Sequence, residues 1–332
     1  MTIQTKAKSV RYWVMNFLLL NLFALSALAV QSAQKQEEDD LRRVWNKKFV
    51  EARDKNATAQ STKPAPTKSS SGRKTRGGEN APTTVASNSS TAVPSPTEKL
   101  NGELIGITFW RLTEAQARAG KSQPGQPGLT VRGSDGRVSQ LTAERVAADT
   151  PFQPGQRVRI GIEIPREKNG YLYVIDREVY ADGTMSEPYL IFPSQNTPPD
   201  GNRVTAGKII YVPAQGDPLP HFTIQRSRAD QVSELLTIIV SPNPLDVQPG
   251  PPNNPTQLDP ALVAQWEKQW GGRTERREMR GGAGAAWTAR EKEAGEGKRK
   301  LLQGDPLPQT VYLVSGKVSG YTLANVPIRL AP

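Results

Sequence analysis

Short apolar runs of strand length, separated by proline and glycine, are the feature that most constrains the fold of this chain. The clearest run covers residues 157–165 (RVRIGIEIP), where four aliphatic side chains alternate with Arg157, Arg159 and Glu163 or with glycine. A period of two places alternate residues on opposite faces of a β-strand. The pattern therefore predicts a strand with one aliphatic face and one face that carries these charges.

Seven runs of this kind lie between residues 104 and 240, with no helical pattern between them. They cover residues 104–112, 157–165, 171–180, 187–192, 208–212, 221–225 and 234–240. Residues 310–315 and 321–330 repeat the pattern near the C-terminus. Strands at this spacing predict a mainly β fold, an antiparallel β-sandwich of the immunoglobulin-like or jelly-roll-like kind.

Residues 258–303 have a different pattern and predict a helical insertion into the β domain of residues 100–257. Asp259 followed by Pro260 is a typical helix start, and Thr288 with Glu291 has the spacing of a capping box. The glycine-rich stretch between these two starts lacks the ending of a phosphate-binding loop. Residues 304–332 then predict two strands that return to the β domain.

A five-residue sequence, Gly-Asp-Pro-Leu-Pro, occurs twice, at residues 216–220 and 304–308, each time just before a predicted strand. Its prolines favour extended backbone. The repeat indicates that the two segments have a shared structural role, although a chain with 28 prolines also makes a chance match plausible.

The first 33 residues have the three-part pattern of a secretory signal peptide. Basic side chains come first, an apolar run at residues 13–30 follows, and Ala27-Leu28-Ala29 forms a small-residue cleavage site. We therefore expect export, to the periplasm or outside the cell. The alternative is an uncleaved inner-membrane anchor through residues 13–30, close to the lower limit of about 17–25 residues for a spanning helix.

Residues 34–99 are rich in Ser, Thr, Pro and basic side chains and predict a disordered linker. Within it, apolar residues at helical spacing favour a short helix at residues 39–50. The linker holds 13 basic and 8 acidic residues, so it carries much of the net charge of +11. No nucleic-acid-binding module accompanies this charge, and we expect no nucleic acid as partner.

The counts of cysteine and histidine exclude several chemistries. There is no Cys and one His, His221, so thiol nucleophiles, thiolate zinc sites and two-His metal sites are excluded. No G-x-S-x-G pattern accompanies His221. We expect no catalytic, cofactor or metal site. The alternatives are carboxylate chemistry or Ca²⁺ binding by an acidic group around one hairpin: Asp176, Glu178, Asp182 and Glu187.

Aromatic residues provide two candidate binding surfaces. In the insertion, tryptophan and arginine are frequent interface anchors, and the candidate partner-binding residues are Trp266, Trp270, Arg273, Arg277 and Trp287. The alternative is that these tryptophans pack the helices onto the sandwich. Tyr171 and Tyr173 share one strand face and would bind glycan if that face is exposed; if it is covered, they belong to the core.

Several motifs between residues 104 and 245 occur in a recognisable order. They are FQPG at 152–155, GYLYVI at 170–175, DGT at 182–184, LIFPS at 190–194 and the late apolar run at 236–244. This order resembles the bacterial domain of unknown function 4384 family (DUF 4384). The resemblance implies a β-rich module attached to bacterial signalling or envelope proteins, and it implies no activity, cofactor or catalytic residue.

These patterns together favour an exported, non-catalytic envelope protein that acts as a protein-interaction module. The expected partner is an envelope protein or cell-wall polymer, with the membrane involved only if the signal is left uncleaved. The alternatives are a glycan-binding or cell-wall-binding protein, and a hydrolase with a carboxylate or His221 centre.

Overall fold

Two antiparallel sheets form the fold, which confirms the predicted mainly β class. The first sheet is the larger: β1 (Glu103–Glu114), β2 (Leu129–Arg132), β3 (Val138–Val146), β4 (Arg157–Glu163), β8 (Ile209–Val212), β9 (Phe222–Thr223), β12 (Arg273–Glu278) and β13 (Thr310–Ser315). The second consists of β5 (Gly170–Tyr180), β6 (Tyr189–Phe192), β7 (Arg203–Val204), β10 (Gln231–Ser241), β11 (Thr256–Gln257) and β14 (Thr322–Arg329). All nine predicted strands are present.

The computed structural model describes residues 39, 42–53, 102–114, 128–132, 138–166, 169–214, 217–279, 281–316 and 318–332. The predicted signal peptide and most of the predicted linker lie outside these residues. Within the described ranges, no helix combines the length and apolarity needed to cross a membrane.

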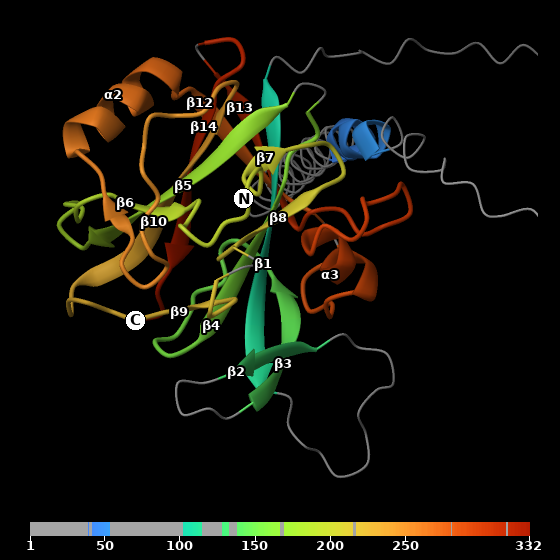
Figure 1. Ribbon diagram of the computed structural model, residues 1–332, viewed down its shortest axis with the longest axis horizontal. Helices are drawn as coiled ribbons and strands as arrows, with labels where there is room; N and C mark the ends of the chain where they lie inside the picture. The colour runs from blue at the N-terminus through green and yellow to red at the C-terminus, as the bar shows by residue number, and fades with distance from the viewer. Residues whose placement is uncertain are drawn as a thin grey trace, which may run out of the picture.

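The long strand β1 organises the first sheet. One of its edges pairs with β4, and the other pairs first with β13 and then with β3. This division curls the sheet, and the β2–β3 hairpin extends beyond the rest of the sandwich (Figure 1). In the second sheet β10 lies between β5 and β14. The two C-terminal strands therefore belong to different sheets, β13 to the first and β14 to the second.

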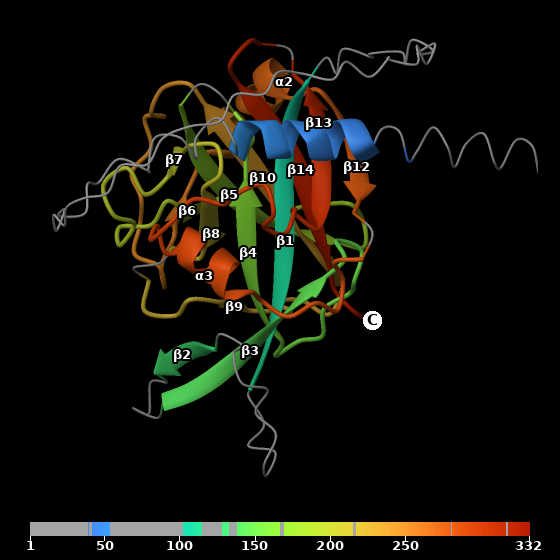
Figure 2. The same ribbon diagram turned by 90° about the vertical axis from the view of Figure 1, so that its right-hand side faces the viewer.

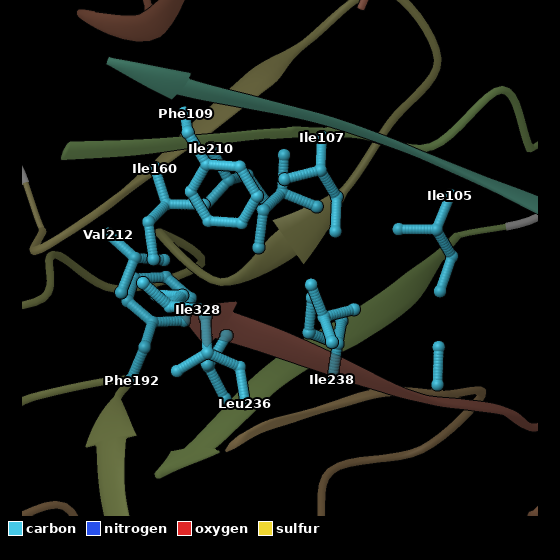
Figure 3. Packing of buried hydrophobic residues seen from close by; sticks show 14 of the residues in the cluster. Ile105, Ile107, Phe109, Ile160, Phe192, Ile210, Val212, Leu236, Ile238 and Ile328 are labelled. Atoms are coloured by element: carbon cyan, nitrogen blue, oxygen red, sulfur yellow. The ribbon is translucent and has the colours of Figure 1, made fainter. Parts of the chain in front are cut away.

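The main core lies between the sheets. Aliphatic and aromatic side chains from both inward faces point toward one another, with Ile107 and Ile160 of the first sheet near Ile238 and Ile328 of the second (Figure 3). All four are at most 4% exposed. Interdigitated side chains from two facing sheets are what the alternating pattern predicts.

Helices cover the outer faces of both sheets. The helix at residues 42–53 lies across β1 and β13 (Figure 2), where Trp45 and Phe49 are buried in a cluster with strand residues. The helix α3 (Ala289–Gly295) covers another part of the same face. The helix α2 (Pro260–Trp270) covers the second sheet. The predicted short helix at 39–50 is therefore a packed part of the sandwich.

The strand β4 has the predicted aliphatic face and charged face, but the charged face is also covered. The sequence pattern did not predict this burial. Arg159 and Glu163 are 1% and 4% exposed. Arg53 of the N-terminal helix donates from Nε and Nη2 to the two Glu163 oxygens at 2.8 and 2.7 Å. The Arg159 guanidinium lies 4.1 Å from the Tyr211 ring centroid. The face of β4 that carries charged residues is therefore buried because the N-terminal helix packs against it.

The predicted helical insertion is only partly helical. Both predicted helix starts are confirmed, because Asp259 accepts from the Ala261 amide and Thr288 forms a reciprocal capping box with Glu291. Between them, however, residues 273–278 (RTERRE) form β12 at the edge of the first sheet. Charged edge strands discourage pairing with other chains, and they lack the apolar alternation that reveals a strand.

The repeated Gly-Asp-Pro-Leu-Pro sequence precedes a strand both times. In both copies the aspartate carboxylate accepts hydrogen bonds from nearby residues of its loop. Asp217 accepts from Ser194 Oγ at 2.6 Å and from the Ala214 amide at 2.8 Å. Asp305 accepts from Arg299 at 2.8 Å and from the Leu302 amide at 2.7 Å. Each buried carboxylate therefore holds together the loop that leads into its strand.

Candidate functional site

A cavity of about 200 Å³ lies between the sheets, where β4, β5, β9, β10 and β14 meet. We call it the inter-sheet cavity. Seven of its thirteen lining residues are apolar and come from both sheets: Val158, Ile160, Ile191, Phe222, Ile224, Leu236 and Ile328. Six polar side chains complete the lining, three of them on β5 and β10 and the other three on or just after β9. An apolar cavity with a few converging polar groups is the usual form of a small-ligand site.

Three carboxylates line the inter-sheet cavity because the inward faces of β5 and β10 change character along the strands. On β5, buried Leu172 and Val174 are followed on the same face by Asp176 and Glu178. On β10, Glu234 precedes buried core residues on the inward face. Glu234 pairs directly with Glu178, which places the two Cβ atoms about 5 Å apart.

Some of the carboxylate oxygens accept hydrogen bonds from the residues that the structure describes, and others do not. Glu178 Oε2 accepts from the Tyr180 hydroxyl at 2.7 Å and also from Ser227 Oγ. Glu234 Oε1 accepts from Gln231 Nε2 at 2.7 Å. Asp176 Oδ1 and Glu234 Oε2 are buried and lack a hydrogen-bond donor among the described residues. These two oxygens are therefore shielded from solvent and lack a donor from the described part of the chain.

Burial and mutual repulsion raise the pKa of two of these carboxyl groups. Loss of hydration, with the charge of Glu178 added, raises the pKa of Asp176 to about 7. Loss of hydration, with the charges of Asp176 and Glu178 added, raises the pKa of Glu234 to about 8. Like charges in a low-dielectric site cannot all ionise together. The empty cavity therefore holds protons at neutral pH.

This proton uptake predicts how stability depends on pH. Between about pH 4 and pH 8 the folded state keeps protons that the unfolded chain has released, so stability falls as pH rises through the pKa values of Asp176 and Glu234. We expect a higher thermal midpoint at pH 5.5 than at pH 8, and a smaller difference in the Asp176→Asn/Glu234→Gln variant. Glu187→Gln, in an exposed position, serves as control. An unchanged pH difference in the double variant would contradict the placement of these groups.

The structure brings together only part of the predicted acidic group. Asp176 and Glu178 line the inter-sheet cavity, whereas Asp182 and Glu187 are exposed beyond the strand. Glu234 was not among the predicted acidic residues, although a glutamate on the aliphatic face of a strand is itself an unusual signal. The described residues contain no group of three or more His, Cys, Asp and Glu placed to hold a metal ion.

His221 is buried, at 7% exposed, and lies outside the cavity lining. Loss of hydration, together with the charges of Arg157 and Arg159, lowers its pKa to about 4. The imidazole is therefore neutral at physiological pH. Its Nδ1 atom lacks a hydrogen-bond partner among the described residues, so a carboxylate that would orient it in a triad is not in place.

The predicted partner-binding residues are distributed over two different faces of the sandwich. Trp266 is 8% exposed under α2 on the second sheet, and Trp287 is 3% exposed against the first sheet. Trp270 is stacked between Trp266 and Tyr321, at centroid distances of 5.5 and 4.5 Å. These tryptophans pack the insertion onto the sheets, which was the alternative considered for them, and a partner-binding role stays a prediction.

The two predicted arginines lie on β12. Arg273 is exposed and pairs with Glu275 at 2.9 Å. Arg277 is half-buried, with its guanidinium 6.0 Å from the Trp45 ring centroid. Of these two arginines, Arg273 is therefore the more accessible.

The predicted glycan-binding tyrosines do not form an exposed pair. Tyr173 is 4% exposed, and its hydroxyl accepts from the Leu245 amide at 2.9 Å. Tyr171 is half-buried, with the Arg203 guanidinium 5.7 Å from its ring centroid. Both belong to or border the cluster that α2 covers, so the face is core, which was the alternative considered for it.

Comparisons with protein-family models, with curated proteins and with solved structures find no match to this chain. The resemblance of residues 104–245 to the domain of unknown function 4384 family therefore stays a prediction.

Proposed function

We propose that the protein is an exported, non-catalytic module of the cell envelope that binds its partner through the inter-sheet cavity. The placement of three carboxylates inside a sandwich supports this proposal. Burying a carboxylate oxygen without a donor costs free energy, so stability does not account for Asp176 and Glu234. Groups of this kind are typical of functional sites.

A pull-down of the tagged full chain from an envelope fraction tests the proposal. We expect one near-stoichiometric protein to be recovered at high salt by the wild type and by Glu187→Gln, and to be lost with Asp176→Asn/Glu234→Gln. Equal recovery of the partner by all three proteins would contradict the proposal that the partner binds at the inter-sheet cavity. Recovery of wall polymer alone, at low salt only, would instead assign binding to the basic residues at 34–99.

The export part of the proposal rests on the pattern of residues 1–33. Sequencing the N-terminus of the protein recovered from fractionated cells tests it. A mature chain that begins close to residue 30 supports a cleaved signal peptide. An intact N-terminus in the membrane fraction supports anchoring through residues 13–30, and an intact N-terminus in the cytosol contradicts export.

One observation favours hydrolase activity as a second candidate function. Neighbouring carboxyl groups with raised pKa values can act as general acid and base, and Asp176 and Glu234 have this arrangement. Turnover of chromogenic ester or glycoside substrates that Glu234→Gln abolishes would support a hydrolase. Turnover that this variant leaves unchanged would exclude the cavity as its centre.

A further inference from the structure

We infer that the inter-sheet cavity binds a primary ammonium group carried on a short aliphatic stem, which is the chemistry of a lysine side chain. This inference rests on the proposed function of the cavity as a binding site and adds the class of ligand.

The charge around the cavity is the first observation. Asp176, Glu178 and Glu234 line it, and its lining contains no Lys, Arg or His. The nearest basic residue along β5, Arg177, lies on the opposite face of the strand, where it bonds Glu267 and Thr237. Arg228, near Tyr180, pairs with Asp230 at 2.7 Å. No basic side chain of the lining therefore balances these carboxylates, and a cationic ligand would take the place of the protons that Asp176 and Glu234 hold.

The carboxylate oxygens without a donor are the second observation. Asp176 Oδ1 and Glu234 Oε2 are buried without a donor, while other oxygens of the three carboxylates already accept hydrogen bonds from Tyr180, Ser227 and Gln231. An ammonium group has three donors and no acceptor. It would supply donors to the carboxylates that line the cavity, whereas an anion would face only repulsion.

The apolar walls are the third observation, and they separate an alkylammonium group from a metal ion. A hard divalent cation needs six or more oxygen ligands, whereas seven of the thirteen lining residues are aliphatic or aromatic, and the described residues contain no group of three or more His, Cys, Asp and Glu placed to hold a metal ion. Phe222, Ile224 and Leu236 would contact a stem of methylene groups. Burial of each further methylene is expected to raise affinity about fourfold while the stem fits.

Three probes of matched length test the inference on the full chain: n-hexylamine, n-hexanol and hexanoate, each titrated by calorimetry at pH 8. We expect n-hexylamine to bind at least tenfold more tightly than n-hexanol, and hexanoate not to bind. Asp176→Asn/Glu234→Gln preserves shape while removing charge, so it is expected to abolish the preference for the amine. Glu187→Gln is expected to keep it.

The outcomes separate the inference from the proposed function. If n-hexanol binds as tightly as n-hexylamine, or if the double variant keeps the preference for the amine, the inference is wrong and the cavity remains a binding site for an apolar ligand. If none of the three probes binds, both are wrong. If n-hexylamine binds as expected, a peptide with one lysine distinguishes the two sources: its binding indicates a protein partner, and its failure indicates a small amine.

Fluorine NMR with a ring-fluorinated phenylalanine at position 222 keeps the inference testable if the double variant does not fold. Saturating n-hexylamine is expected to shift this resonance in the wild-type chain, and n-hexanol at equal concentration is expected to shift it less. Equal shifts with both probes would overturn the inference.

Discussion

Replacing Arg53 with alanine is expected to lower the free energy of unfolding by about 3–5 kcal/mol. The Arg53 side chain is completely buried, and besides its two bonds to Glu163 it donates to the Asp305 and Pro306 carbonyls at 2.9 Å. Its loss leaves Glu163 as a buried charge without a counterion. Urea unfolding of wild type and variant gives the difference directly.

The matched control for this substitution is Lys47→Ala in the same helix. The Lys47 side chain is 72% exposed and lies 3.7 Å from Glu51, so its removal is expected to change stability by less than about 1 kcal/mol. Replacing both members of the buried pair, as in Arg53→Met/Glu163→Leu, is expected to restore much of the loss. An Arg53→Ala variant as stable as Lys47→Ala would mean that the helix does not dock on the sheet.

Replacing Trp287 with alanine is the second large effect, expected to cost about 3–5 kcal/mol. The indole is 3% exposed, lies 6.0 Å from the Trp110 ring and 5.5 Å from the Tyr211 ring, and donates from Nε1 to the Tyr211 hydroxyl at 2.8 Å. Leu302→Ala removes an apolar side chain that is 44% exposed, and is expected to have little effect. Thermal and urea unfolding measure both.

This second substitution also discriminates between two interpretations of the tryptophans. A packing role predicts lost stability. A partner-binding role predicts a variant as stable as the wild type that fails to recover its partner, and that result would favour the partner-binding interpretation.

The predictable part of the fold is the part with apolar alternation. The strands that became β4, β5 and β10 have one face directed at the main core, and a period of two makes that visible. The short helix at residues 39–50 was predicted from its spacing, but its position on the sheet was not. No local pattern states that Arg53 meets Glu163, which is 110 residues further along the chain.

The missed elements have physical reasons as well. The strand β12 is charged because it lies at an edge, so its pattern resembles that of a loop or an exposed helix. Burial of Trp266 and Trp287 was one of two interpretations of the sequence, and the packing of the insertion onto the sheets, which no local pattern states, decides in its favour. Part of the acidic lining of the cavity was predictable from the sequence, because Asp176 and Glu178 were among the predicted acidic residues. Glu234 lies next to them only because of the register between β10 and β5, which the sequence does not show.

Carboxyl NMR of the full chain, with the resonances of Asp176 and Glu234 followed from pH 4 to pH 9, tests the central claim most directly. We expect midpoints near 7 and 8 for the protein alone, and a downward shift of both when n-hexylamine is present, because a bound cation favours the ionised carboxylates. Midpoints near 4 that n-hexylamine leaves unchanged would contradict a buried, cation-binding cavity between the two sheets.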